Sequence, residues 1–172
     1  MSPEEYVAAY RAAKDKWMRE NPDSPLPPDR RDTFVGLSYY PFDERYLLTV
    51  PLDRDVTPEP IIMETSTGDR REYHRAGKIR LVVDGDEAEA TVFRGPDGEL
   101  FLPIRDATSG KETYGAARYV EPESLDDDTV LVDLNELYNP FCAYDERFSC
   151  PLPPRENWLT IPIRAGEKIP EI

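Results

Sequence analysis

The sequence predicts a mostly β fold, an antiparallel β-barrel or sandwich with one N-terminal α-helix. Apolar residues recur with a period of two from Thr33 onward, and turn dipeptides such as Asp84-Gly85 separate the alternating segments. A helical period occurs only at the start of the chain. The 172 residues, 39% of them hydrophobic, suffice for one core. We therefore expect a single domain over residues 1–172, with the helix within 1–21 and a β domain over 33–172.

The helix is expected to begin at Pro3. Ser2 is placed to cap it, Pro3 suits the first helical position, and Glu5 stands at the capping-box position. The helix should end before Asn21, because a proline follows. A stripe of apolar residues at helical spacing is expected to face the core, and its members are Tyr6, Tyr10, Ala13 and Trp17.

The clearest strand pattern lies in residues 78–104. Apolar residues alternate on both sides of Asp84-Gly85, a dipeptide that favours a two-residue hairpin turn. A second turn at Gly95–Gly98 leads into a third alternating segment. We therefore expect a three-stranded meander. The side chains expected on its core side are Ile79, Leu81, Val83, Ala90 and Val92.

Further short strands bring the expected total to eight or nine, a number typical of a barrel or sandwich. Their expected segments are 61–65, 70–74, 113–120, 130–134 and 158–164, with another alternating run from Tyr46 to Leu52. The 18 prolines gather in the intervening loops. Aromatic residues interleave with them in 139–157, which predicts an ordered Pro-rich loop folded across one opening of the sheet.

The charge balance excludes several partners. The chain has 35 acidic and 21 basic residues, a formal net charge of -14, which would repel nucleic acid and anionic membranes. The first ten residues resemble no signal peptide, and no run of about 18 apolar residues occurs, so a cytoplasmic protein is expected. Only five of the 21 basic residues are lysines. Scarce lysine and many carboxylates favour a salt-adapted protein.

No decisive catalytic or cofactor motif is present, and no cofactor is expected. Residues 109–111 resemble part of a phosphate-binding loop, but Arg105 and Glu112 stand where that motif needs glycine and Ser or Thr. The dinucleotide-binding and nucleophile-elbow glycine motifs are absent as well. His74 is the single histidine, which excludes a zinc site with several His ligands.

Cys142 and Cys150 are the only cysteines, and seven residues separate them. Four interpretations are open. They are buried structural thiols, a disulfide, two ligands of a metal site completed by His74 and carboxylates, or a nucleophilic Cys142 thiolate assisted by Arg118 or Arg147. In each case we expect the cysteines to lie close together and largely buried.

A polar cluster occupies residues 112–119. In a strand, even spacing places Glu112, Tyr114 and Arg118 on one face and Tyr119 on the other. Arginine can bind a carboxylate or phosphate through two N–H groups, and tyrosines offer stacking surfaces and hydroxyl donors. The alternative is an ion pair between Glu112 and Arg118 that only joins neighbouring strands.

The leading functional hypothesis is binding of a small polar or anionic molecule where this strand runs beneath the 139–157 loop. The alternatives are a hydrolase or transferase with Cys142 as nucleophile, and a structural or interaction module without a pocket. The sequence sets no oligomeric state. The candidate ligand-binding residues are Glu112, Tyr114, Arg118, Tyr119, Asn139 and Tyr144.

An ordered series of short motifs runs along the chain. They are Ser24-Pro25-Leu26, Phe34–Leu37, Tyr40-Pro41, Thr108-Ser109-Gly110, Glu112–Tyr119, Asp133-Leu134-Asn135, Tyr138-Asn139-Pro140, Cys142-Ala143-Tyr144, Cys150–Pro154, Glu156-Asn157 and Ala165-Gly166-Glu167. The series resembles domain-of-unknown-function family 1684 over nearly the whole chain, departing at Ala117, where glycine is expected. The resemblance implies that both cysteines belong to the motif set, and it assigns them no catalytic role.

The acidic composition predicts that salt stabilises the folded protein. We expect the melting temperature to rise steeply with KCl into the molar range, because a Debye length of about 3 Å at 1 M screens the repulsion between crowded carboxylates. Circular dichroism melting curves across a KCl series measure this. A melting temperature that does not change with salt would contradict the salt-adapted interpretation.

Overall fold

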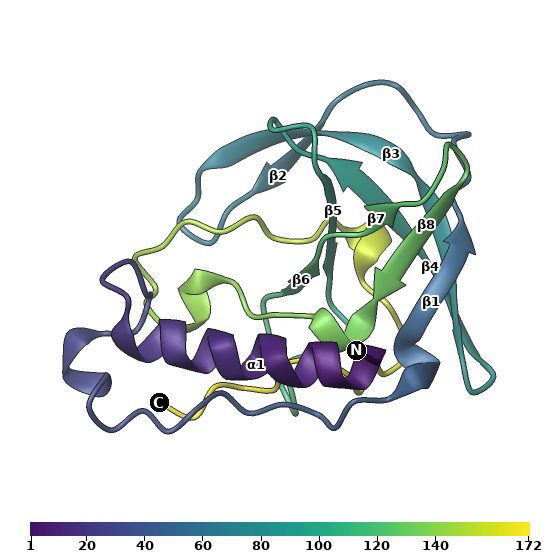
Figure 1. Cartoon of the computed structure of the whole chain (residues 1–172). Helices are drawn as coiled ribbons and strands as arrows, with labels where there is room; N and C mark the ends of the chain where they lie inside the picture. The colour runs from purple at the N-terminus through teal and green to yellow at the C-terminus, as the bar shows by residue number, and fades with distance from the viewer.

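A computed structural model describes all 172 residues and is mostly β, with a helix at the N-terminus (Figure 1). Helix α1 spans Pro3–Glu20. The strands are β1 (Leu47–Pro51), β2 (Ile61–Glu64), β3 (Arg70–Val83), β4 (Asp86–Arg94), β5 (Leu100–Ile104), β6 (Arg118–Val120), β7 (Glu123–Ser124) and β8 (Thr129–Asp133). The predicted fold class is confirmed. No helix has the length and apolar character needed to cross a bilayer.

Helix α1 begins as its sequence predicts. The Ser2 hydroxyl accepts a hydrogen bond from the Glu5 N–H at 3.1 Å, and the Glu5 carboxylate accepts one from the Ser2 N–H at 2.7 Å. Together they form a complete capping box. The helix ends before Asn21, whose N–H still bonds the Trp17 carbonyl.

The predicted apolar stripe of α1 is not its buried face. Tyr6 and Tyr10 are 53% and 39% exposed, whereas Val7 and Met18 are almost fully buried. The other two members of the stripe lie at exposed and half-buried positions. The spacing of the apolar residues therefore predicted the wrong face of α1 to be buried.

The face of α1 that packs carries charged side chains between its two buried residues. The Arg11 guanidinium donates to the carbonyls of Tyr40 and Asn135, at 2.8 and 3.2 Å. Lys14 forms an ion pair with Glu167, whose side chain is 2% exposed. Long basic side chains can bury their stems when their charged ends find partners. The partners here come from distant parts of the chain, so the helical pattern alone does not reveal this face.

Five strands, in the order β2-β3-β4-β5-β6, form an antiparallel sheet that curls into a half-barrel (Figure 1). Strands β3 and β4 are joined through Asp84 and Gly85, which both have positive φ, 50° and 82°, as this type of tight turn requires. All five side chains predicted for the core side of the meander are buried, at most 6% exposed. The meander prediction is confirmed.

The remaining strands form a three-stranded sheet in the order β1-β8-β7. The two sheets meet where β3 bulges between Arg75 and Gly77. There Asp53, just past the end of β1, exchanges two backbone hydrogen bonds with Lys78, at 2.8 and 2.9 Å. Because of this bulge, the predicted strand 70–74 and the first strand of the meander form one continuous strand, β3. A core of 19 buried residues fills the interior.

The predicted strand 113–120 is a strand only in its last three residues, β6. The residues before it form a compact turn in which the Thr108 carbonyl accepts the N–H groups of residues 111–113. The rule of alternating faces therefore does not apply to Glu112 and Tyr114. Asp84 is the only non-glycine residue with positive φ, so Ala117 has ordinary backbone geometry and replaces the expected glycine without strain.

The predicted strand 158–164 is extended but forms no ladder. One isolated parallel bridge joins Trp158 to Arg105. Leu159, Ile161 and Ile163 are buried with the expected period of two. The alternation was predicted correctly, and the sheet pairing was not, because the polar backbone groups of this segment bond to side chains and loops instead.

The junction at the bulge can be tested with Gly77→Ala. A Cβ there would lie 2.7 Å from the Asp53 carbonyl oxygen and from the Leu52 side chain. Relieving such a clash costs about 1–3 kcal/mol, so we expect the free energy of unfolding in urea to fall by that amount. Gly115→Ala is the matched control, because its Cβ would have no atom nearer than 3.4 Å. Equal stability of the two variants would contradict this role of the bulge.

Candidate functional site

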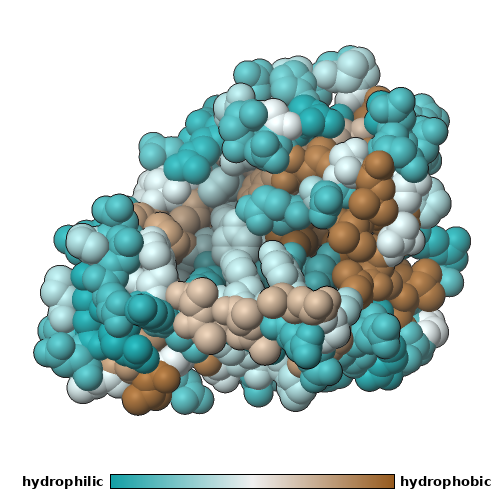
Figure 2. All heavy atoms as spheres, in the orientation of Figure 1, coloured by the Kyte–Doolittle hydropathy of each residue, from teal (hydrophilic) through white to brown (hydrophobic).

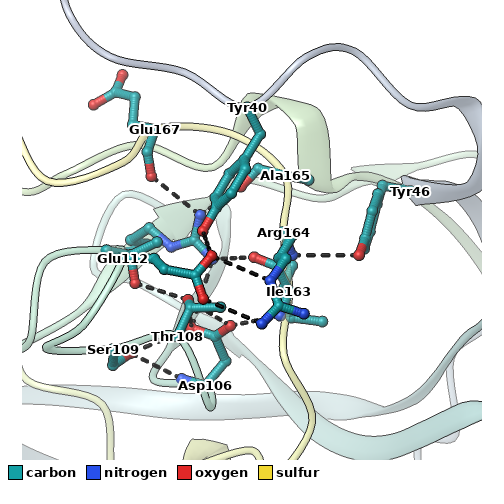
Figure 3. Close-up of polar contacts among 12 residues, drawn as sticks. Tyr40, Tyr46, Asp106, Thr108, Ser109, Glu112, Ile163, Arg164, Ala165 and Glu167 are labelled. Atoms are coloured by element: carbon teal, nitrogen blue, oxygen red, sulfur yellow. Dashed lines mark hydrogen bonds and ion pairs between the residues drawn. The ribbon is translucent and has the colours of Figure 1, made fainter.

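Arg118 lies inside the protein, not at a binding surface. It is 1% exposed. Its terminal nitrogens donate to the carbonyls of Ile163 at 2.8 Å, Glu167 at 3.2 Å and Ala165, and Nη2 lies 3.5 Å from the Asp106 carboxylate (Figure 3). Burial lowers the pKa of Arg118, and the Asp106 charge acts in the opposite direction. An anion could reach this guanidinium only by displacing the backbone, so the predicted capture of an anionic ligand by Arg118 is wrong.

Asp106 completes the same network. Its carboxylate accepts hydrogen bonds from the Thr108 hydroxyl at 2.9 Å, the Ser109 hydroxyl at 3.2 Å and the Ile163 N–H at 2.6 Å (Figure 3). The residue is 7% exposed. A buried carboxylate with this many donors ties the turn before β6 to the C-terminal segment.

Glu112 has partners other than those predicted. It accepts a hydrogen bond from the Tyr40 hydroxyl at 2.7 Å and pairs with Arg164 at 3.1 Å (Figure 3). Hydrogen bonds from Arg164 and Tyr40 lower the pKa of Glu112. The alternative interpretation, an ion pair between Glu112 and Arg118, is therefore wrong as well, because Arg118 pairs with Asp106.

Asn139 and Tyr144 meet at the carboxylate of Glu167. The Asn139 N–H and the Tyr144 hydroxyl bond the same carboxylate oxygen, at 2.9 and 3.3 Å, while Lys14 pairs with the other oxygen. Burial and the Glu167 charge raise the pKa of Tyr144. This group anchors helix α1 and the 139–157 loop to the C-terminal segment.

Tyr114 and the two cysteines form a further cluster. The Cys142 N–H donates to the Cys150 Sγ at 3.3 Å, and the Tyr114 hydroxyl donates to the Cys142 Sγ at 3.5 Å. The cysteines carry free thiols and are 7% and 8% exposed, so their predicted proximity and burial are confirmed. The Tyr119 hydroxyl adjoins this cluster, because it donates to the carbonyl of Pro151, the residue that follows Cys150.

None of the groups predicted to assist Cys142 does so. Arg118 pairs with Asp106, and Arg147 pairs with Asp145 at 2.6 Å. His74, which was considered as a further ligand of a metal site, is exposed on β3. No group of three or more His, Cys, Asp or Glu side chains could hold a metal ion. The thiol pair therefore has two side-chain hydroxyls beside it, those of Tyr114 and Ser66, and no adjacent base.

The six candidate ligand-binding residues thus do not form one site. None of them lines the cavity between β3, β5 and the β4–β5 turn. In Figure 2 a hollow opens above helix α1, with hydrophobic residues along its right side and hydrophilic residues above it. A cavity of about 310 Å³ lies between β3, β5 and the β4–β5 turn. Its apolar wall consists of Tyr73, Leu100 and Phe101, and its charged rim of Asp97, Glu99 and Glu121.

A row of aromatic rings runs from this cavity toward α1. The rings of Tyr73 and Phe101 stack with centroids 5.6 Å apart. Phe101 meets Tyr119 edge-on at 4.8 Å, and Tyr119 meets Tyr138 edge-on at 5.8 Å. At the end of the row the Lys14 ammonium lies 5.1 Å from the Tyr138 ring centre. We call the cavity and this row the aromatic groove.

Carboxylates are the only charged side chains lining the cavity. Glu121 accepts a hydrogen bond from the Tyr138 hydroxyl, and burial raises the pKa of Glu121. A second cavity of about 390 Å³ beside it has Glu123, Asp133 and Glu136 as its charged side chains. Burial and these neighbouring carboxylates raise the pKa of Glu136. The charged side chains that line these two cavities are therefore all carboxylates.

Of the residues in the aromatic groove, the sequence predicted only Tyr119 as a candidate. A signal was present in β5, where Phe101 stands between Leu100 and Leu102, so that both faces of the strand are apolar. Such a strand must be covered on its second face or form part of a cavity. Glu121, two residues after Tyr119, offered no comparable signal.

The architecture defines a mostly β half-barrel protein whose extended C-terminal segment is fixed by an internal arginine. The chain belongs to the family described as protein of unknown function (DUF1684), whose model matches residues 32–168. It is similar to an uncharacterized protein from Haloarcula marismortui solved by solution NMR, with 37% identity, a TM-score of 0.72, and coverage of 96% of this chain and 93% of that chain. No protein with a curated description matches.

The role of Arg118 can be tested with Arg118→Leu. The change leaves Asp106 buried without its counter-ion and three carbonyls without a donor, so we expect stability to fall by about 3–5 kcal/mol in urea unfolding. Arg164→Leu is the control, because that side chain is 55% exposed and its ion pair is worth no more than about 1 kcal/mol. If the two variants lose the same small amount, the buried network does not hold the fold.

Proposed function

We propose that this protein binds a small, positively charged molecule with a planar or aromatic part in the aromatic groove. The observation that carries the proposal is the stacked Tyr73–Phe101 wall beside three carboxylates, with no basic side chain lining the same cavity. The proposal keeps the small-molecule function expected from the sequence. It places the ligand in a different site and gives it the opposite charge.

The physical argument rests on two attractions. A cation over an aromatic face gains about 0.5–2 kcal/mol, and a cation that donates to a carboxylate forms a charge-assisted hydrogen bond of about 1.5–3 kcal/mol. The cavity of about 310 Å³ is large enough for a ligand of ten or so non-hydrogen atoms. An anion would meet the carboxylates of Asp97, Glu99 and Glu121.

Glu121 is the central residue of the proposed site. It lies at the cavity rim and also bonds Tyr138, so it joins the cavity to the far end of the aromatic row. Burial and the charge of Asp97 both raise its pKa, which means that the carboxylate is stabilised too little by the protein alone. A bound cation would supply the missing stabilisation.

Three indole compounds of similar shape test this site by isothermal titration calorimetry. We expect the cation tryptamine to bind, and the neutral 3-methylindole and the anion indole-3-propionate to bind at least tenfold more weakly. Glu121→Gln should weaken tryptamine binding about tenfold, the equivalent of about 1.4 kcal/mol. Asp29→Asn, an exposed carboxylate that lines no cavity described above, should leave binding unchanged. Equal binding of the anion and the cation would refute the proposal.

Because the pKa of Glu121 is raised, a loss of binding in Glu121→Gln can be distinguished from a loss of folding. A carboxyl whose folded pKa lies above its unfolded value adds stability at low pH, and that stability is lost as the pH rises through the folded pKa. Glutamine carries no charge, so Glu121→Gln should be at least as stable as the parent at neutral pH. Tryptamine affinity should fall as the pH is lowered through the pKa of Glu121.

A further inference from the structure

The thiol cluster lies outside the aromatic groove and has no part in the proposed ligand binding. Cys142 belongs to a short 3-10 turn, Phe141–Ala143, and Cys150 stands at the other end of the loop that follows. The backbone N–H of Cys142 reaches the Cys150 sulfur at 3.3 Å, so the two thiol-bearing residues are in direct contact. The two sulfurs are free thiols and form no disulfide.

Contacts from a distant hairpin hold this pair in place. Ser66, in the β2–β3 turn, accepts the Cys150 N–H at 3.1 Å and donates its own N–H to the Cys150 carbonyl at 2.9 Å. Arg71 donates to the Ser149 carbonyl at 2.7 Å. The position of Cys150 is therefore fixed by β2 and β3, and the pairing does not depend on a flexible loop.

The surroundings favour a thiolate on Cys142. The Tyr114 hydroxyl donates a hydrogen bond to the Cys142 sulfur at 3.5 Å. Hydrogen bonding from Cys150 and Tyr114 lowers the pKa of Cys142 to about 6, although burial opposes it. The same contact with Cys142 raises the pKa of Cys150, which keeps that sulfur protonated. The pair thus consists of one nucleophilic sulfur and one thiol beside it.

We propose that Cys142 and Cys150 form an oxidation site, at which Cys142 reacts with a small hydroperoxide and Cys150 then closes a disulfide with it. The geometry that carries the proposal is the contact between the two residues, the hydroxyl donor on Cys142 and the anchoring of Cys150 by the β2–β3 hairpin. Exposures of 7% and 8% admit only a small oxidant such as hydrogen peroxide.

The proposed reaction has two balanced steps. The Cys142 thiolate attacks one peroxide oxygen, an S–O bond forms, the O–O bond breaks, and the leaving oxygen takes a proton to become an alcohol or water. Cys142 is then a sulfenic acid. The Cys150 sulfur attacks the Cys142 sulfur, an S–S bond forms, the S–O bond breaks, and hydroxide leaves with the Cys150 proton as water. Two thiols are oxidised, and one peroxide is reduced.

The test exposes the reduced full-length protein to hydrogen peroxide under native conditions and follows it by mass spectrometry. We expect the loss of two hydrogens per chain, a Cys142–Cys150 cross-linked peptide in a non-reducing digest, and full reversal by dithiothreitol. The rate should rise through a pH of about 6, where Cys142 ionises. Thiols that both stay free, or that react only after urea has unfolded the chain, would overturn the proposal.

Two single variants assign the roles. In the Cys150→Ser variant, oxidation should stop at a Cys142 sulfenic acid, which dimedone labels. The Cys142→Ser variant should form neither the dimedone adduct nor the disulfide. Tyr114→Phe removes the donor to Cys142 and should slow the first step severalfold without preventing the second. Melting curves of each variant show whether it is folded, and the wild-type disulfide remains a readout that needs no variant. Dimedone labelling of Cys150 instead of Cys142 would contradict the assignment.

Discussion

The fold depends on one buried ion pair, between Arg118 at the start of β6 and Asp106 in the turn before it. The C-terminal segment packs its apolar side chains into the core without joining a sheet, so its backbone groups need other partners. Arg118 supplies donors for three of its carbonyls, and Asp106 accepts the N–H of Ile163. A buried pair of this kind is maintained when hydrogen bonds satisfy most of its polar atoms, and here every guanidinium nitrogen of Arg118 except Nε has a partner. Glu167, at the end of the same segment, then receives Lys14 of helix α1.

This constraint explains where a function can reside. Arg118, Asn139 and Tyr144 have the chemistry of a ligand site, but their polar groups bind other parts of the chain. The groups left for other molecules lie on two sides of that framework. One is the aromatic groove, whose cavity has carboxylates as its only charged side chains and where we propose that a cation binds. The other is the thiol pair, where two sulfurs meet beside a hydroxyl. They share no residue, and they adjoin where the Tyr119 hydroxyl bonds the Pro151 carbonyl next to Cys150.

Local signals in the sequence predicted the local structure. The capping box at Ser2 and the hairpin at Asp84-Gly85 were correct because short-range geometry decides both. The buried face of α1 was predicted wrongly, since its charged residues find partners more than a hundred positions away, as Lys14 does. The candidate site failed for a similar reason. Arg118 bonds backbone carbonyls that lie 45 or more residues further along, and no residue type marks a carbonyl as its partner. Only the cysteines were placed correctly, because their short spacing limits where they can lie.

Native-state hydrogen exchange of the Ile163 amide tests the central claim most directly. This N–H is donated to Asp106 at 2.6 Å, close to the C-terminus of the chain, where backbone amides ordinarily exchange through local fraying. If the buried ion pair fixes this segment as part of the fold, the amide should exchange only through global unfolding, with the same free energy that urea unfolding gives. Exchange through a local opening of much lower free energy, while the strands β3 and β4 remain protected, would contradict the account.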